Sequence, residues 1–466
     1  MKNNNKLPIS VKLAYAAPVF ALAVVGIPIY VYIPKFYTDV MGMDIALLGA
    51  LLFSVRLFDA VTDPIIGAWS DKTNTRLGRR RPFIAIGSVL VAGAMMMLFM
   101  PPAMSPGKTA LWFGVSIYAL FLFWTAVVVP YESLGPEITY NYDERTELFG
   151  LRDGFLIART LMAASSPALI RWIFGVPKYV SGESTVFLLM AIIYAPLVIT
   201  TCWYCVSKIR EAAPPQQRSL PGIKESVRVT LRNRPFLILL ASYTISAIGS
   251  SLPATLILYY VQYVLRSETA EAFLLLYFVT GIAFLPLWVR LAKKIGKKAA
   301  WIMSMAVNTG AFTGVFFLGA GDVIAYGILV FLSGIGFGAT LALPSAMQAD
   351  VIDYDELLTG TRREGHYIGL WSISKKLAAA VGIGAGLSIL GSVGYTPNVE
   401  QQDNVLLTLR VLYAGVPSVC NGIALIIALL YPITGKKHRD IRTAVEQRLS
   451  GMPAMDPLRR MEPPIR

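Results

Sequence analysis

Long apolar stretches recur along the chain, and short polar or charged connectors separate them. A helix that crosses a membrane needs roughly 20 mostly apolar residues. Twelve such stretches lie between residues 12 and 432, so the pattern predicts an all-α membrane protein with twelve transmembrane helices. We place them near 12–37, 42–69, 83–101, 109–137, 148–174, 185–207, 236–265, 270–292, 299–319, 323–350, 366–392 and 405–432.

Basic residues are concentrated on alternate connectors. One set of connectors, with the two ends of the chain, holds Lys2, Lys6, Lys12, Lys72, Arg76, Arg79, Arg80, Arg81, Lys208, Arg210, Arg218, Lys224, Arg228, Arg232, Arg234, Lys293, Lys294, Lys297, Lys298, Arg362, Arg363, Lys436 and Lys437. The opposite set holds little beyond Lys35, Lys108, Lys178 and Arg266. Because cytoplasmic connectors carry the positive charge, we expect a multi-pass protein of the cell membrane with both termini cytoplasmic.

The composition agrees with this topology. Of the 466 residues, 55% are hydrophobic and 15% are charged, whereas soluble domains average about a quarter charged. The net charge of +14 follows from the basic connectors, so we expect no nucleic-acid partner. Three Cys and two His are too few for a disulfide framework or a zinc array. The chain has no P-loop and no constellation typical of a soluble enzyme, so we expect neither an enzyme nor an ATP-driven pump.

Two halves of the chain share an order of features. The connectors after spans two and eight both carry a basic residue, a Gly two positions later and then a basic pair. Spans four and ten both contain a proline, Pro130 and Pro344. This predicts two pseudo-symmetric six-helix bundles, 1–207 and 236–433, joined by a cytoplasmic linker, 208–235. We expect the Pro-rich tail, 434–466, to be disordered.

The clearest chemical signal is a pair of carboxylates in span two. Asp59 and Asp63 are four residues apart, so they share one helix face about one turn apart. Away from water such a pair must share a proton, hold a cation or face a base. Oxygen ligands suit a hard cation such as sodium, and Thr62 adds a hydroxyl. The alternative is a static salt bridge to Arg56.

These residues also carry a resemblance. The connector with Gly67, Asp71, Lys72, Gly78, Arg79 and Arg80 resembles the signature loop of the major facilitator superfamily. The run R-x-x-D-A-x-x-D-P over 56–64 resembles the span-two motif of the glycoside-pentoside-hexuronide:cation symporters, the melibiose-permease family. The similarity continues through Lys12–Tyr15, Phe36–Val40, Pro130-Tyr131, Glu144-Arg145, Arg152, Ala349–Tyr354, Arg362, Glu364 and Lys375-Lys376. It implies the major facilitator fold around a central cavity.

The resemblance implies that the family's cation site is retained in this chain and that its sugar site is changed. The family's cation ligands fall on Asp59, Asp63 and Thr125, and a lysine linked to that site falls on Lys376. The family's sugar-holding residues are replaced: its aspartates fall on Ala23 and Val128, and an aromatic falls on Glu132. The cation site is therefore expected to be kept and the sugar site to be altered, which argues against galactoside transport.

Several further residues are candidates for substrate binding or gating. Glu132 is expected to bind a cation, a proton or a polyhydroxyl substrate, or else to pair with Arg152 or Arg159 of span five. Tyr367 and Trp371 are placed to stack on a sugar ring. Lys375 and Lys376 are adjacent, so only one of them is expected to face the cavity, and the resemblance implies that it is Lys376. The expected cytoplasmic gate comprises Asp71, Arg79, Arg80, Asp153 and Arg362. There Asp71 would pair with a basic residue in one conformation and latch the two bundles.

Together these features predict a secondary active transporter that alternates its access. It would couple sodium or proton entry to symport of a sugar, glycoside or sugar acid, with no other cofactor, as a monomer in the lipid bilayer. Two alternatives remain at this point: a carrier of a lysolipid or other amphiphile, and an integral-membrane enzyme.

Overall fold

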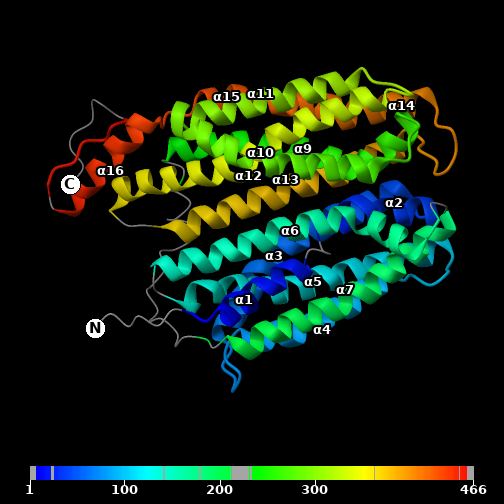
Figure 1. Ribbon diagram of the computed structural model, residues 1–466, viewed down its shortest axis with the longest axis horizontal. Helices are drawn as coiled ribbons and strands as arrows, with labels where there is room; N and C mark the ends of the chain where they lie inside the picture. Colours follow the sequence, from blue (N-terminus) through cyan, green and yellow to red (C-terminus); the bar gives the residue numbers. More distant parts are fainter. Residues whose placement is uncertain are drawn as a thin grey trace.

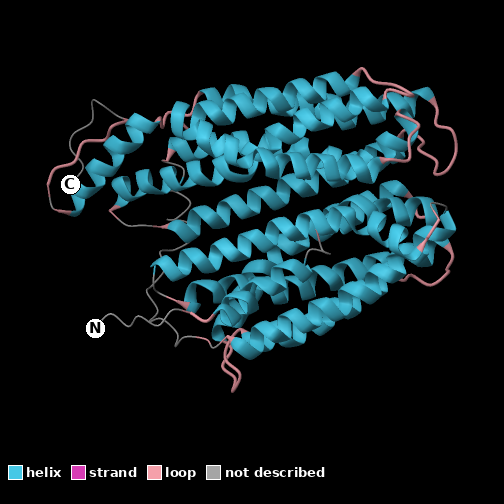
Figure 2. Cartoon of the chain, in the orientation of Figure 1, coloured by secondary structure: helices cyan, strands magenta, loops and turns pink. Residues whose placement is uncertain are grey.

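The computed structural model describes residues 7–22, 26–139, 142–177, 180–209, 211, 230, 233–360, 363–450 and 452–458. Throughout these residues the ordered elements are helices, and the helices form two stacked halves (Figures 1 and 2). Ala23, Arg362 and most of the expected linker lie outside the described residues.

The first half contains six rods. The first rod is interrupted and consists of α1 (Ile9–Ala21), η2 (Pro28–Tyr32), α2 (Ile33–Lys35) and η3 (Phe36–Val40). The other five are α3 (Ile45–Lys72), α4 (Arg81–Phe99), α5 (Pro106–Ile138), α6 (Tyr142–Phe174) and α7 (Val180–Lys208).

The second half repeats this arrangement. Its first rod consists of α9 (Arg234–Tyr259) and η4 (Tyr260–Val264), and its last consists of α14 (Asp403–Arg410), η5 (Val411–Gly415) and α15 (Val416–Leu429). Between them lie α10 (Ala270–Ile295), α11 (Lys297–Phe316), α12 (Val323–Thr359) and α13 (Glu364–Ser392).

The rods have the length and surface of membrane helices. Among the described residues, ten helices are long and apolar enough to cross a membrane. The interrupted first rod and α6, which carries Arg152, Asp153 and Arg159, complete the twelve. Large apolar side chains face outward, and Trp172 and Ile324 are each 81% exposed, as expected of surfaces that contact lipid. The predicted all-α architecture of twelve membrane-crossing helices is confirmed.

Part of the C-terminal tail, which we expected to be disordered, is a helix. Residues Gly435–Leu449 form a further helix, α16, which begins at Thr434, whose hydroxyl accepts a hydrogen bond from the Lys437 amide. Ile441, Ala444 and Val445 are buried, and their spacing of three and four residues forms one apolar stripe. The prolines that suggested disorder follow this helix, so the expectation of a disordered tail is wrong for 435–449.

The two halves meet along α3 and α13, and they meet more closely at one end. We call the end near α16 the terminal end and the end near α2 and α14 the distal end (Figure 1). A Cβ on Gly384 would lie 2.6 Å from the Phe53 Cβ, and one on Gly391 would lie 2.8 Å from the Ala46 Cβ. Only glycine allows so close an approach.

Toward the terminal end this contact stops. No described atom lies within 4 Å of a Cβ built on Gly369. Nearby, Trp69 of α3 and Ile368 of α13 are 61% and 56% exposed. The interface is therefore closed at the distal end and open at the terminal end.

Candidate functional site

The middle of α3 carries the two predicted carboxylates, and α5 supplies a hydroxyl that joins them. Asp59 is buried, and Asp63 is partly buried one turn later. The Thr125 hydroxyl lies 2.9 Å from the Asp59 Oδ1 and 3.2 Å from the Asp63 Oδ1. The structure thus brings together the three oxygen-bearing side chains that the resemblance placed at a cation site.

Two basic side chains neutralise this pair. The Lys376 ammonium of α13 lies 3.0 Å from the Asp59 Oδ2 and also bonds the Asp63 Oδ2. Arg56 lies 3.2 Å from the Asp59 Oδ2, and its guanidinium also stacks on the ring of Tyr30, 4.3 Å away. The predicted salt bridge between Arg56 and Asp59 is therefore present, and the Lys376 ammonium bridges both aspartates.

Two other predicted ligands, Thr62 and Glu132, do not contact the two aspartates directly. The Thr62 hydroxyl donates to the carbonyl of Asp59 at 3.2 Å, within its own helix, so the structure does not bring it to the carboxylates. Glu132 makes no ion pair with Arg152 or Arg159 in the described part of the chain. Instead Arg152 pairs with its neighbour Asp153 at 2.8 Å. Glu132 remains within electrostatic range of Asp63, Lys376 and both arginines.

A cavity of about 530 Å³ lies mainly in the second half, beside this cluster. Aromatic side chains from several helices line it: Tyr30, Tyr243, Tyr277, Phe278, Phe312 and Phe337. Lys375 also lines it, whereas its neighbour Lys376 faces the aspartates. Of the two lysines, Lys375 therefore lines the cavity, and the expectation that Lys376 would do so is wrong, because consecutive helix positions point about 100° apart.

The two aromatics predicted to stack on a substrate differ in position. Tyr367 is fully buried at the terminal end, where its hydroxyl bonds Asp355 at 2.8 Å and accepts from Asn233. This corrects its assignment, because a side chain enclosed by protein cannot reach a substrate. Trp371 stacks on Tyr243 with ring centroids 4.1 Å apart, so it supports a ring that lines the cavity.

The predicted gate residues form a charged cluster at the terminal end of the first half. Arg80 pairs with Asp71 at 3.0 Å and with Glu137 at 2.9 Å, and Arg79 pairs with Glu137 at 3.1 Å. Glu211 accepts hydrogen bonds from the backbone amides of three consecutive residues that lead into α4, Arg79, Arg80 and Arg81. In this structure these pairs stay within one half and its adjoining segment, so they do not latch the bundles. Asp153 lies outside this cluster, bonded to Arg152.

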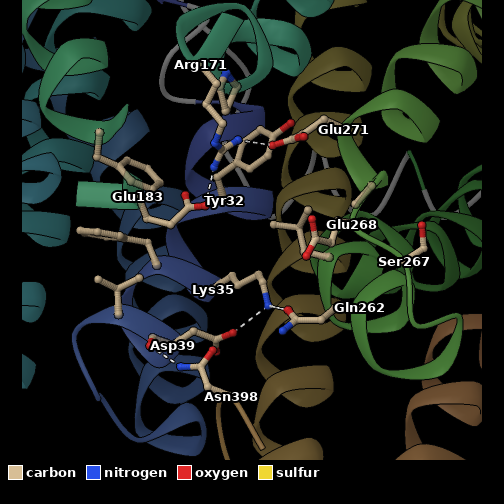
Figure 3. A pocket seen from close by; sticks show the side chains of 16 residues that line it. Tyr32, Lys35, Asp39, Arg171, Glu183, Gln262, Ser267, Glu268, Glu271 and Asn398 are labelled. Carbon is tan, nitrogen blue, oxygen red and sulfur yellow. Dashed lines mark hydrogen bonds and ion pairs between the residues drawn. The ribbon is translucent and has the colours of Figure 1, made fainter. Parts of the chain in front are cut away.

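A second set of charged contacts joins the halves at the distal end, around a pocket of about 220 Å³ (Figure 3). Arg171 of α6 bonds Glu183 of α7 and, across the interface, Glu271 of α10. Lys35 bonds Asp39 at 2.7 Å and also bonds Gln262 of the other half. The two contacts that cross between the halves were missed in the sequence because their partners are 100 and 227 residues apart and share no local motif.

Residues 14–435 match the family of MFS/sugar transport proteins. The chain belongs to this family. Its relatives include an uncharacterized symporter of Synechocystis (28% identical, covering 95% of this chain and 97% of that protein). A glucuronide carrier protein homolog of Escherichia coli is 28% identical, covering 90% and 91% of the two chains. An isoprimeverose transporter of Lactiplantibacillus pentosus is also 28% identical, covering 92% and 90%.

Solved structures agree with the family fold. A bacterial homolog of the human lysosomal transporter Spinster matches with a TM-score of 0.63 at 14% identity, covering 91% of this chain and 95% of that one. The nucleoside transporter NupG matches with a TM-score of 0.63 at 13% identity, covering 91% and 100%. The chain is therefore a multi-pass membrane transporter of the MFS sugar-transport family, and the enzyme alternative is set aside. The resemblance to the glycoside-pentoside-hexuronide:cation symporters is confirmed.

Proposed function

We propose that the protein is a cation-coupled symporter of a sugar, glycoside or sugar acid, with sodium or a proton as the coupling ion. One observation carries the proposal: the Lys376 ammonium lies between Asp59 and Asp63, where a cation would bind. Two carboxylates this close need a shared proton or a positive charge between them. In the cation-free state that charge comes from the opposite half of the molecule.

The coupling follows from competition for these carboxylates. An entering cation replaces the Lys376 ammonium and takes the oxygens of Asp59, Asp63 and Thr125 as ligands. Release of Lys376 removes an ionic contact between α3 and α13, so cation binding changes how the halves hold each other. By linkage, a substrate that favours the released arrangement tightens cation binding by the same factor.

The structure corresponds in this proposal to an inward-facing state. Because cytoplasmic connectors of membrane proteins carry the positive charge, we assign the terminal end, with its basic connectors, to the cytoplasmic side of the cell membrane, and both chain termini with it. The open interface at the terminal end then faces inward. One chain contains both halves and the complete cavity, so the monomer is the proposed working unit.

The test is uptake into proteoliposomes under an imposed sodium or proton gradient. We expect wild-type protein to accumulate a labelled sugar or sugar acid above its external concentration. Asp59→Asn and Asp63→Asn should abolish accumulation, because each removes a charge that holds the cation, while the protein still inserts. Asp403→Asn, an exposed carboxylate at the start of α14, is the matched control and should retain uptake. Accumulation that survives both site substitutions contradicts the mechanism.

An amphiphile such as a lysolipid is the second candidate cargo. The apolar part of the cavity wall, which includes Ile27, Leu274 and Phe278, favours it. Thermal-shift screening of sugars, sugar acids and lysolipids, with and without sodium, separates the two: stabilisation by lysolipids alone would support the amphiphile.

A further inference from the structure

Lysines surround a place at the terminal end where helices of the second half meet (Figure 1). The Lys298 ammonium, at the start of α11, donates a 2.7 Å hydrogen bond to the carbonyl of Leu429, at the end of α15. The same ammonium lies within electrostatic range of Lys437, in the first turn of α16. Two exposed lysines lie in the last turn of α10, just before this point. We call the following residues the lysine cluster: Lys293, Lys294, Lys298, Lys436 and Lys437.

The lysine cluster carries a positive excess. No member of it forms an ion pair with any residue in the described part of the chain. The nearby carboxylates of α12 are engaged elsewhere, since Asp350 pairs with Lys297 at 2.6 Å and Asp353 pairs with His438 at 3.0 Å. Asp440 of α16 is exposed and is the other carboxylate at this place. A surface with this charge attracts anions.

The first half of the molecule shows what the corresponding connector binds. α4 is the third rod of the first half, as α11 is of the second, and each connector holds its glycine at a positive φ, 114° at Gly78 and 92° at Gly296. In the first half the Glu211 carboxylate accepts hydrogen bonds of 2.6 to 2.8 Å from the three backbone amides that follow this glycine. The connector geometry therefore presents amides to a negatively charged group.

The start of α11 presents the same amides without a protein carboxylate. Among the described residues, no side chain accepts a hydrogen bond from the backbone amides of 297–299. The amides at the start of a helix carry partial positive charge and bind anions such as phosphate. Here the lysine cluster adds full charges beside them, so the place that Glu211 fills in the first half suits an external anion in the second.

Apolar surface adjoins the lysine cluster. Leu429 and Leu430, at the end of α15, are 52% and 67% exposed, and Ile295 of the connector is 44% exposed. Because Lys298 bonds the carbonyl of Leu429, the charged and the apolar surfaces are contiguous. A phospholipid presents the matching order, with acyl chains in the membrane and a phosphate at its surface. Basic pockets on the cytoplasmic side of membrane proteins bind acidic lipid headgroups in this way.

We propose that the lysine cluster binds the phosphate of an anionic phospholipid in the cytoplasmic leaflet, with the acyl chains against the adjoining apolar surface. The phosphate accepts hydrogen bonds at the start of α11, as the Glu211 carboxylate does at the start of α4. One lipid thereby links α10, α11, α15 and α16 at the terminal end. This binding goes beyond the transport function and does not depend on which cargo is carried.

The experiment counts lipids bound to the full-length protein by native mass spectrometry. Protein in a non-ionic detergent is titrated with dioleoyl phosphatidylglycerol and, separately, with dioleoyl phosphatidylcholine, which has the same acyl chains and no net charge. We expect the first phosphatidylglycerol to bind at a lipid concentration about tenfold lower than the first phosphatidylcholine, because several lysines attract its charge. Equal binding of the two lipids overturns the proposal.

Variants assign this preference to the lysine cluster. Lys294→Gln and Lys437→Gln remove ammonium groups that bond no described residue, and each should weaken phosphatidylglycerol binding about fivefold. Ala299→Glu places a carboxylate in the first turn of α11 and should remove the preference. Lys108→Gln, an exposed lysine in the first turn of α5 at the distal end, is the matched control and should bind as wild type. A preference that survives all three cluster variants, or that Lys108→Gln weakens equally, overturns the proposal.

Inorganic phosphate distinguishes a lipid from a free anion. The melting temperature of the protein in detergent is measured with phosphatidylglycerol and with inorganic phosphate at matched ionic strength. We expect phosphatidylglycerol alone to raise it, because free phosphate brings no acyl chains, and we expect Ala299→Glu to lose the rise. An equal rise with inorganic phosphate would assign the lysine cluster to a soluble anion and overturn the lipid.

Discussion

At the scale of single residues, a small set of oxygen atoms surrounds the positive charge between Asp59 and Asp63. Thr125 belongs to a different helix from the aspartates, and its hydroxyl contacts both carboxylates while only 1% of the residue is exposed. A cation that replaces Lys376 would find this oxygen already in place, so little reorganisation is needed on binding.

Removing that oxygen gives the residue-scale prediction. Thr125→Val keeps the shape and loses the hydroxyl, so we expect the sodium or proton concentration for half-maximal substrate binding to rise about tenfold, the usual cost of losing an interaction with a charge. Thr125→Ser keeps the oxygen and should behave as wild type. Calorimetry with methyl β-glucuronide at several cation concentrations measures the effect. An unchanged cation requirement in Thr125→Val would exclude Thr125 from the site.

At the scale of elements, α3 and α13 form the close contact between the two halves, which we call the seam. Their contact is tight where Gly384 and Gly391 face Phe53 and Ala46, and it opens beyond Lys376 toward the terminal end. Glycine at these positions lets two backbones approach closely enough to exclude water from the distal side. Lys376 contacts Asp59 and Asp63 near the point where the tight packing of α3 against α13 ends. Loss of this ionic contact would therefore make it easier for the two helices to separate.

A bulky side chain in the seam should therefore shift the conformational equilibrium. Gly384→Leu would collide with Phe53, and we expect it to favour opening at the distal end. The measurement is labelling by a membrane-impermeant maleimide of Thr38→Cys, a position that is 1% exposed beside Tyr259, in a cysteine-free background. Labelling should rise several-fold in Gly384→Leu. Gly369→Leu, in the same helix with open space around it, should leave labelling unchanged. Equal labelling in both variants would contradict the seam.

At the scale of the whole molecule, Arg171 makes an ionic link between the halves at the distal end. It holds Glu183 of its own half and Glu271 of the other, and its side chain is only 10% exposed. Breaking one member of a buried charged group is costly because the remaining charges stay unpaired, whereas an exposed pair contributes little.

This contrast gives a prediction with an internal control. Arg171→Gln should destabilise the closed distal end and raise labelling of Thr38→Cys by about tenfold, as expected for loss of a buried ionic partner. Arg266→Gln breaks the exposed pair with Glu400, within one half, and should have no effect. If both variants label like wild type, the Arg171 link is not what keeps the distal end closed.

Features that depend on local sequence could be predicted, whereas features that depend on how the two halves pack could not. Apolar length determines the number of spans, and the R-x-x-D-A-x-x-D-P run identifies the site of Asp59 and Asp63, because both signals are local. The direction in which Lys375 points is not local: it depends on how the second half packs against the first. Tyr367 was assigned wrongly for the same reason, since its partners Asp355 and Asn233 become visible only after folding.

The most direct test of the central claim is the mutual dependence of cation and substrate binding. Methyl β-glucuronide is titrated by calorimetry into nanodisc-embedded protein at a series of sodium concentrations and, separately, of pH values. We expect its affinity to rise as one of the two cations is added, and we expect Asp63→Asn to remove this dependence, because the site between the aspartates is then lost. An affinity that is the same at every sodium concentration and every pH would contradict coupling through Asp59 and Asp63.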